Sequence, residues 1–549
     1  MKSRRSTLQT IRDRQFDVCV IGGGATGSGT ALDSQLRGKS TLLLEGEDFT
    51  SHTSSKSTKL VHGGVRYLQQ AVADFDYGQF KMVRKALHER IHMLHAAPFL
   101  ANSLELLVPC YSLYEMVYYG IGMKVYDAIS GKTRIFPTRI LSKAQALQRL
   151  PGLRGDRLVG AVSYADGQFD DARYGITLVQ TFAEQGGEVL NYAKVVGFGR
   201  TPEGKLSSAE VVDQVSGERL TVQARIFVNC TGPHADEIRL MANPEISRRL
   251  RLSKGVHILL PVGPMGSDAA LLIPKTEDGR VIFAIPWLGS LLVGTTDDEI
   301  DSETAMVANE REIAYLLKYT NRYLNTAFTH ADVQAAFAGA RPLVASKDAV
   351  NTKKLIRDHE VEVDERSNLV SILGGKWTTH RAMAEDGVNH ALHLLGDSQA
   401  RCKTIDFPLF GAKGFHPGYW RQLAEQHSLS TETAQHLAQK FGTAAPRVLE
   451  VAASQPELRE PLYPGGAALA CEVVYCVREE MARTIEDILA RRVGIQFHRW
   501  KDAIAAAPVV GRLLGRELGW DESQTAEAVK AYVASIQRLS ESAGQSTRV

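Results

Sequence analysis

A glycine-rich turn near the start of the chain carries the clearest chemical signal. Gly22, Gly24 and Gly27 form the pattern G-x-G-x-x-G directly after the strand-like run 16–21. The first glycine permits a tight turn, the second lets backbone approach a pyrophosphate, and the third lets a helix pack closely with its positive end toward the phosphates. Glu45, at the end of the next apolar run, can accept hydrogen bonds from ribose hydroxyls. The pattern predicts dinucleotide binding; the alternative is a glycine turn that only packs a helix on a sheet.

Two later segments indicate which dinucleotide to expect. Thr231 and Gly232 follow a strand-like run in the form that closes over the cofactor in flavoproteins. Gly374 and Gly375 precede Lys376 at a strand-to-helix junction, where backbone N–H groups and a helix N-terminus can meet the pyrimidine carbonyls of a flavin. The glycine pattern has no second copy in the sequence, so a separate nicotinamide domain is not expected. Together these features favour FAD over NAD.

Five further strings make the sequence similar to the FAD-dependent glycerol-3-phosphate dehydrogenases. They are TSSKSTKLVHGGVRYL (53–68), SYADGQFDDAR (163–173), RPL (341–343), GKWTT (375–379) and EEMARTIEDILARR (479–492). The sequence resembles the mitochondrial type and its bacterial relatives more closely than the shorter enterobacterial type. No calcium-loop pattern follows residue 500, so the calcium-binding extension of the animal enzymes is not expected.

The resemblance implies a reaction and its partners. The enzyme would oxidise sn-glycerol 3-phosphate to dihydroxyacetone phosphate by hydride transfer to FAD, and would pass the electrons to a membrane quinone. It would be cytoplasmic, or peripheral on the cytoplasmic face of the inner membrane. A homodimer is left open, and no metal site and no nucleic-acid partner are expected.

The same resemblance points to the residues that bind the substrate phosphate. Arg66 is the leading ligand, because a guanidinium presents a planar fork to phosphate oxygens. Tyr67 can add a phenolic hydrogen bond, and Arg341 and Lys376 would complete a positive pocket near the substrate and the flavin.

His62 is the preferred general base, since imidazole titrates near neutral pH and can accept the hydroxyl proton. The alternative gives that task to Arg341, Lys376 or a bound water, with His62 only shaping the flavin loop. His257 can approach the substrate from the cap, or it is a structural histidine on a strand. Further flavin or substrate contacts are expected from hydroxyl or backbone groups of Thr53, Ser54, Ser57, Thr378 and Thr379.

Three positions depart from the family pattern. His380 stands where tyrosine commonly follows GKWTT, which would alter hydrogen bonding beside the isoalloxazine. Gly339 and Ala340 precede Arg341 where Gly-Ile or Gly-Val is usual, which should change only packing. His234 follows TGP where an aromatic residue is common. None of the three removes a proposed catalytic group.

The elements that position these residues indicate an α/β protein. A strand, a helix at about 24–36 and a second strand at 40–48 form a β-α-β unit, the usual context of a dinucleotide fold. Further strand-like runs occur at 225–233, 255–261, 279–287, 290–298 and 368–375. Beyond about residue 400 helical spacing dominates, and one helical face would carry Val473, Val477, Met481, Ile485 and Ile488.

The resemblance refines this into three parts. We expect a glutathione-reductase-like, Rossmann-type FAD-binding domain, a mixed α+β substrate cap and an all-α C-terminal domain. The expected ranges are 16–90, 150–240 and 345–395 for the FAD-binding domain, 91–149 and 241–344 for the cap, and 396–549 for the helical domain.

The composition is that of an ordinary globular protein. The chain has 549 residues, 44% hydrophobic and 23% charged, with a net charge of +2, so no concentrated basic face for nucleic acid is indicated. Six scattered cysteines without CxxC spacing favour buried thiols in a reducing compartment. No apolar stretch is long enough to span a bilayer. The aromatic-rich segment 111–129 is either a surface that dips into a membrane interface or a cap helix packed on its neighbours.

Two other enzyme classes and one non-enzymatic role stay open. An oxidase of the same family would give its electrons to oxygen and make hydrogen peroxide. An amine or amino-acid oxidase on the same fold would bind no phosphate, so Arg66, Arg341 and Lys376 would lose their joint purpose. A non-enzymatic flavin-binding protein would leave its flavin unreduced by every candidate alcohol.

Overall fold

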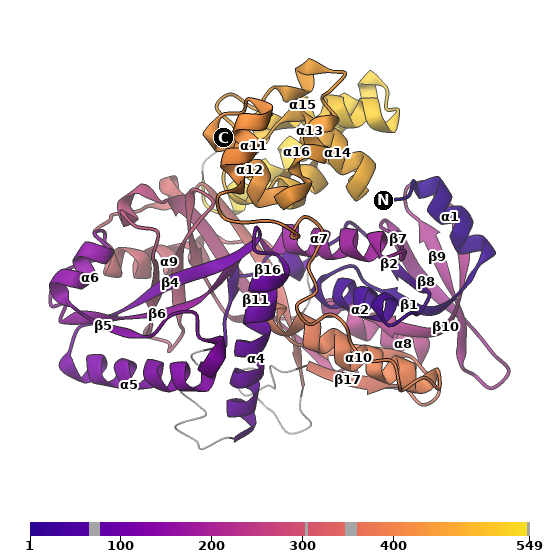
Figure 1. Cartoon of the computed structure of the whole chain (residues 1–549), viewed down its shortest axis with the longest axis horizontal. Coiled ribbons are helices and arrows are strands. Elements are labelled where there is room, and N and C mark those ends of the chain that lie inside the picture. The colour runs from indigo at the N-terminus through magenta and orange to yellow at the C-terminus, as the bar shows by residue number, and fades with distance from the viewer. Residues whose placement is uncertain (65–76, 302–305, 346–358, 546–549) are drawn as a thin grey trace.

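The computed structural model describes residues 1–64, 77–301, 306–345 and 359–545. Arg66 and Tyr67, the expected phosphate ligands, therefore lie outside the described residues. The described part contains two β-sheets side by side and a group of C-terminal helices above them (Figure 1).

The first sheet has the strand order β17-β18-β10-β1-β2-β7, in which all neighbours are parallel except β17 and β18, and β9 and β8 extend it from β10. Its strands are β1 (Gln15–Ile21), β2 (Thr41–Leu44), β7 (Glu188–Leu190), β8 (Ala193–Arg200), β9 (Leu206–Asp213), β10 (Arg219–Asn229), β17 (His359–Val363) and β18 (Val370–Gly374). β1 pairs in parallel with both β2 and β10, so it lies at the centre of the sheet.

Helices or strands cover both faces of this sheet. Side chains on a strand alternate between the faces, and those of β1 are apolar on both. Val18 and Val20 pack in one hydrophobic cluster, while Cys19 and Ile21 pack in another. The first cluster lies under α2 (Ala25–Leu36), α7 (Asp171–Glu184) and α10 (His380–Leu394). The second lies under α1 (Arg4–Asp13), α8 (Ala235–Ala242) and the β8–β9 hairpin. The predicted β-α-β unit and the predicted α/β fold class are confirmed.

The second sheet is largely antiparallel, in the order β15-β11-β14-β13-β12-β4-β6-β3, with β16 on β11 and β5 on β6. Its strands are β3 (Leu60–Val61), β4 (Ala101–Cys110), β5 (Arg139–Ser142), β6 (Gly160–Phe169), β11 (Leu250–Pro261), β12 (Ala270–Ile273), β13 (Ile282–Trp287), β14 (Ser290–Gly294), β15 (Asp298–Ile300) and β16 (Ala335–Val344). Its helices are α4 (Tyr77–Ala96), α5 (Leu113–Ser130), α6 (Lys143–Arg149) and α9 (Glu310–Tyr323).

Two strands of this second sheet fall in ranges that we expected in the FAD-binding domain. β3 and β6 lie within 16–90 and 150–240, yet β6 pairs with β4 along its whole length, from Ala101 opposite Phe169 to Cys110 opposite Gly160. Local sequence predicts that a segment is a strand but does not name its partner, which explains the difference. The chain therefore passes between the two sheets more often than the predicted domain ranges imply.

The C-terminal part is helical, as predicted. Its elements are α11 (Tyr419–His427), α12 (Thr431–Phe441), α13 (Ala445–Glu450), α14 (Ala470–Glu480), the π-helix η11 (Asp487–Arg492), α15 (Trp500–Leu518) and α16 (Glu522–Ser542). The prediction of one continuous helical face from Val473 to Ile488 is wrong, because α14 ends at Glu480 and Met481 takes a left-handed φ of 56°. The helix ends where buried polar contacts from other segments meet the chain: Arg492 donates to the Glu480 carbonyl and Asn191 to that of Met481.

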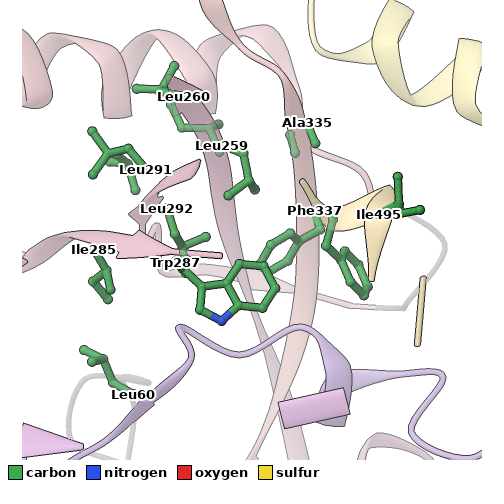
Figure 2. Packing of buried hydrophobic residues seen from close by; sticks show 14 of the residues in the cluster. Leu60, Leu259, Leu260, Ile285, Trp287, Leu291, Leu292, Ala335, Phe337 and Ile495 are labelled. Atoms are coloured by element: carbon green, nitrogen blue, oxygen red, sulfur yellow. The ribbon is translucent and has the colours of Figure 1, made fainter. Parts of the chain in front are cut away.

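The helical part shares a hydrophobic core with the second sheet. Trp287 and Phe337 from the sheet and Ile495 from the C-terminal part belong to one buried cluster (Figure 2). The cysteines are free, and all are buried except Cys402, which is partly exposed. Within the described residues, no helix combines the length and the apolar character needed to cross a membrane.

Candidate active site

One cavity of about 620 Å³ runs between the two sheets. At one end it reaches the glycine turn after β1, and at the other it reaches Leu272 and Phe283 of the second sheet and Tyr119 and Met123 of α5. Most of the predicted site residues line it, namely Gly22, Gly24, Glu45, Thr53, Ser54, Ser57, His62, Thr231, Gly232, His257, Arg341, Gly374, Gly375, Lys376 and Thr378. Gly27 and Thr379 do not line it.

The glycine turn is shaped for an anion at the start of α2. Gly22 has a φ of 104°, which favours glycine, and a Cβ on Gly27 would lie 1.7 Å from the Gly22 carbonyl oxygen. Gly27 therefore allows the helix to pack against the turn, which is the role that the sequence predicted for it. Gly24 precedes the helix, the Ala25 N–H donates to the Ser54 hydroxyl at 2.9 Å, and the cavity reaches the N-terminal end of the helix there. Such an end attracts phosphate through its backbone N–H groups and its dipole.

Glu45 lies beside this turn, at the end of β2. One carboxylate oxygen accepts a hydrogen bond from the Gly23 N–H at 2.6 Å, and the other accepts from the Glu47 N–H at 2.8 Å. Burial raises the pKa of Glu45, and the two backbone bonds only partly offset this. Each carboxylate oxygen has a second lone pair, so the group can still accept from ribose hydroxyls. The turn and the acid thus fit the adenosine and pyrophosphate parts of FAD.

A second pair of glycines forms the wall at the flavin end. Gly374 and Gly375 have φ values of 71° and 88°, and the short 3-10 turn η8 (Trp377–Thr379) follows Lys376. The Thr378 hydroxyl oxygen accepts from the His62 N–H at 3.3 Å, which ties this turn to the loop after β3. The Thr379 hydroxyl instead donates to the Lys376 carbonyl at 3.3 Å, so it shapes the turn from outside the cavity.

His62 is neutral at physiological pH. Burial, together with the positive charges of Lys376 and Arg90, lowers the pKa of His62 to about 4. The ring meets Phe283 edge-on, with 5.9 Å between the ring centroids. An unprotonated imidazole is the state that a proton acceptor requires.

His257 lies on β11 and is 2% exposed. Its Nε2 lies 2.9 Å from the Thr58 hydroxyl, and its ring stacks on Phe337 at 5.0 Å. Its Nδ1 has no hydrogen-bond partner among the described residues. Burial, Arg341 and Lys59 hold the pKa of His257 well below its usual value. A buried nitrogen without a hydrogen-bond partner, on a residue that lines a cavity, is suited to a ligand or a water.

Arg341 is held by groups that the sequence reasoning missed. Its Nη2 donates to the Thr295 hydroxyl at 2.8 Å, and its Nη1 donates to the Asp297 carboxylate at 3.2 Å. Both partners also line the cavity. The TTDD string at 295–298 that ends a predicted strand was the available signal. The carboxylate of Asp297 orients the guanidinium of Arg341 and partly offsets its positive charge in the cavity.

The departures from the family pattern lie at different depths. His380 is buried behind η8, where its Nδ1 donates to the Trp377 carbonyl at 3.0 Å, and it does not line the cavity. His234 does line the cavity, and its ring meets that of His52 at 5.0 Å. No group of three His, Cys, Asp or Glu side chains in the described part of the chain is placed to share a metal ion.

The first sheet, the glycine turn after β1 and the wall formed by Gly374 and Gly375 define a dinucleotide-binding oxidoreductase of the flavoprotein type. The sequence profile of the family described as FAD dependent oxidoreductase matches residues 17–385, and that of the C-terminal domain of alpha-glycerophosphate oxidase matches residues 402–525.

Relatives narrow the class further. The mitochondrial glycerol-3-phosphate dehydrogenase of Bos taurus is 39% identical over 542 residues, which cover 96% of this chain and 74% of that protein. The corresponding mitochondrial protein of Arabidopsis thaliana is 38% identical over 530 residues, 93% of this chain and 84% of its own. The glycerol-3-phosphate dehydrogenase of Bacillus halodurans, solved as a complex with FAD, superposes with a TM-score of 0.80 at 28% identity and 97% coverage of both chains. This chain belongs to the FAD-dependent glycerol-3-phosphate dehydrogenase family, and FAD is its cofactor.

Proposed function

We propose that this protein oxidises sn-glycerol 3-phosphate to dihydroxyacetone phosphate and passes the electrons to a membrane quinone. One observation carries the proposal: a single cavity joins the dinucleotide-binding turn to an end that holds two cations, Arg341 and Lys376, and a neutral imidazole, His62. A phosphorylated secondary alcohol needs such groups, because its phosphate is anionic and its hydroxyl must lose a proton. FAD, when bound, supplies the acceptor for the two electrons and the hydrogen of substrate C2.

The cations bind and orient the substrate. Arg341 presents a guanidinium whose position is held by Thr295 and Asp297, so it can meet phosphate oxygens with little loss of side-chain freedom. Lys376 adds a second charge from the turn after β18. Arg66 and Tyr67, which the family resemblance assigns to the phosphate, lie outside the described residues and stay predictions.

His62 takes the hydroxyl proton in this proposal. Its lowered pKa keeps it unprotonated in the free enzyme, and a bound phosphate dianion would raise that pKa, because a nearby anion stabilises imidazolium. His62 therefore becomes a stronger base when the substrate arrives. The alternative gives the proton to Arg341, Lys376 or a bound water, but a bound phosphate dianion would favour the protonated, cationic form of both side chains.

The face of α5 is our proposed contact with the membrane. Leu113 (73% exposed), Tyr114 (77%), Val117 (59%) and Ile121 (60%) point to solvent along one side of the helix. Basic side chains flank this patch in exposed positions, namely Lys124, Lys132, Arg134 and Arg139. Exposed apolar side chains followed in the chain by exposed cations match the interface of an anionic bilayer.

The other side of the same helix favours a lipid-soluble acceptor. Tyr119 and Met123 of α5 line the far end of the cavity. A quinone that leaves the bilayer beneath α5 would thus be close to the cavity, which supports a peripheral position on a membrane. We propose the cytoplasmic face of the inner membrane. The three-part domain division stays part of this proposal, with the exception that β3 and β6 belong to the second sheet. We leave a homodimer open, and light scattering would test it.

Anaerobic titration of the FAD-loaded protein with sn-glycerol 3-phosphate tests the proposed function. Bleaching of the visible flavin band is expected, followed by recovery of the band on addition of a soluble quinone. Stoichiometric hydrogen peroxide in air, with no reoxidation by quinone, would instead identify an oxidase. A band that persists with glycerol 3-phosphate but bleaches with an amine or amino acid would contradict the proposal.

A further inference from the structure

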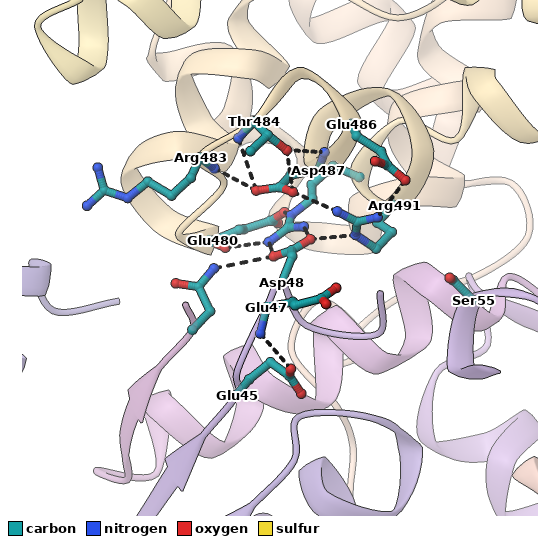
Figure 3. A network of polar contacts seen from close by, with 12 residues as sticks. Glu45, Glu47, Asp48, Ser55, Glu480, Arg483, Thr484, Glu486, Asp487 and Arg491 are labelled. Atoms are coloured by element: carbon teal, nitrogen blue, oxygen red, sulfur yellow. Dashed lines mark hydrogen bonds and ion pairs between the residues drawn. The ribbon is translucent and has the colours of Figure 1, made fainter. Parts of the chain in front are cut away.

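The turn after β2 has one residue that faces away from the cofactor. Glu45 and Glu47 line the cavity, whereas Asp48 does not and is only 1% exposed. Figure 3 shows Asp48 directed at the C-terminal helices, on the side opposite to Glu45. A buried carboxylate must be paired or strongly hydrogen-bonded, because its desolvation is otherwise too costly.

Both charged partners of Asp48 come from the π-helix η11, more than four hundred residues later in the chain. One carboxylate oxygen accepts from Arg491 Nε at 2.5 Å and also from Arg492 Nη1, and the other accepts from Arg492 Nη2 at 2.9 Å. Asn191 donates a weaker bond at 3.3 Å. Burial by itself would raise the pKa of Asp48, but Arg492 and Arg491 outweigh it, so the pKa is lowered and the group stays ionised.

A second set of contacts joins the same helix to the neighbouring strand end. The Tyr192 hydroxyl lies 2.8 Å and 2.9 Å from the two carboxylate oxygens of Asp487, and Arg491 Nη2 donates to Asp487 at 2.6 Å. The Tyr192 N–H in turn donates to the Glu47 carbonyl at 2.8 Å. The residues from Glu45 to Asp48 are thus held by η11 both directly and through Tyr192.

The charges in this network balance. Among the buried members, three acids meet three arginines, all at most 5% exposed, and these are Asp48, Glu480, Asp487, Arg173, Arg491 and Arg492. At the edge of the network Arg491 also lies 3.6 Å from the exposed carboxylate of Glu486. A balanced network that is sealed from water is not screened by salt and fixes its members in one geometry.

We infer that the C-terminal helical part clamps the ribose-binding turn of the cofactor site, with Asp48, Arg491 and Arg492 as positioning residues for FAD. The clamp acts through Glu45, which precedes Asp48 by three residues in the chain. The carboxylate of Glu45 contacts the glycine turn by accepting a hydrogen bond from the Gly23 N–H. Holding the carboxylate in place before FAD arrives lowers the entropy lost on binding. The inference depends on the cofactor alone and not on the proposed substrate.

The test is fluorescence titration of the full-length apoprotein with FAD. Asp48→Asn is expected to weaken FAD binding by about tenfold or more, as is Glu45→Gln. If Asp48 acts through Glu45, adding Asp48→Asn to Glu45→Gln should weaken binding far less than it does alone, because coupled residues give non-additive effects. Arg478→Gln, which breaks an exposed pair with Glu517 in the same C-terminal part, is the matched control and should leave FAD affinity unchanged.

Arg491→Lys is a milder variant, since it keeps the charge and loses the fork geometry. It replaces Asp48→Asn in the FAD titration if Asp48→Asn does not fold, and it should also weaken FAD binding. A lowered melting temperature of the apoprotein with FAD affinity within about twofold of wild type would reduce the network to a purely structural one and overturn the inference. Fully additive effects of Asp48→Asn and Glu45→Gln would overturn it as well.

Discussion

The hydroxyl oxygen of Tyr126 lies 2.8 Å from the backbone nitrogen of Gly63, the residue after His62. The same hydroxyl donates to the carboxylate of Asp166 at 2.9 Å, and Asp166 pairs with Arg90 at 2.6 Å. Tyr126 belongs to α5, whose opposite side is exposed and apolar. A single helix therefore holds the loop of the proposed base and presents the proposed membrane surface.

Tyr126→Phe should slow flavin reduction while FAD stays bound. It leaves the Gly63 N–H without its acceptor, so the His62 loop keeps only its bond to Thr378, and stability should fall by about 1–3 kcal/mol. Stopped-flow reduction and urea unfolding measure the two effects. Tyr315→Phe, which removes an exposed bond to Asp278, is the control. An unchanged reduction rate at equal loss of stability would show that the bond is only structural.

The low pKa of His62 belongs to the free enzyme, so it should appear in the pH dependence of the second-order rate constant for flavin reduction at low substrate concentration. Because this pKa is lowered to about 4, the imidazole is neutral at pH 7 and is lost as a base only as the pH falls through that value. A separate limb near pH 6 is expected from the substrate phosphate itself, whose second pKa is about 6. His62→Gln should be about 10²–10⁴-fold slower and should lack only the lower limb. A limb near pH 7 that vanishes in His62→Gln would contradict this assignment.

Lys59→Met should destabilise the loop that carries the family signature. The Lys59 ammonium is 0% exposed, pairs with Asp171 and lies over the rings of Trp287 and Phe337 at 5.0 and 5.1 Å. Removing one member of a buried ion pair costs about 3–5 kcal/mol, because the other charge is left uncompensated.

Urea unfolding measures that loss, and Lys59→Met combined with Asp171→Leu should lose less than the sum of the two single variants. Lys318→Met, which breaks the exposed pair with Glu277, should cost at most about 1 kcal/mol. Additive losses in the double variant would mean that the two side chains do not stabilise each other.

Charged substitutions on α5 test the membrane surface. Val117→Glu with Ile121→Glu should abolish flotation with vesicles that contain anionic phospholipid, because two carboxylates would face the bilayer. Reduction by glycerol 3-phosphate in solution should stay at the wild-type rate, since neither side chain lines the cavity. Val215→Glu, at a position 47% exposed on the first-sheet side, is the control. Unaltered flotation of the α5 variant would place the contact elsewhere.

Much of the cofactor site could be predicted because its signals are local. The strand at 16–21, the helix that follows and the glycines between them occupy one short stretch, and β1, α2 and the Gly22 turn confirm them. Gly374 and Gly375 were equally visible at a strand-to-helix junction. Patterns of this kind depend on backbone conformation and on neighbours along the chain, which the sequence contains.

Contacts between distant segments could not be predicted in the same way. The pairing of β6 with β4, the left-handed break at Met481, and the ion pairs of Asp48 with Arg491 and Arg492 join segments that no periodicity relates. The hold of Asp297 on Arg341 is of the same kind. Residue types in the sequence thus specify the cofactor and the family, while the geometry that holds the cofactor turn and the base loop arises from folding, because burial and partner choice depend on the whole chain.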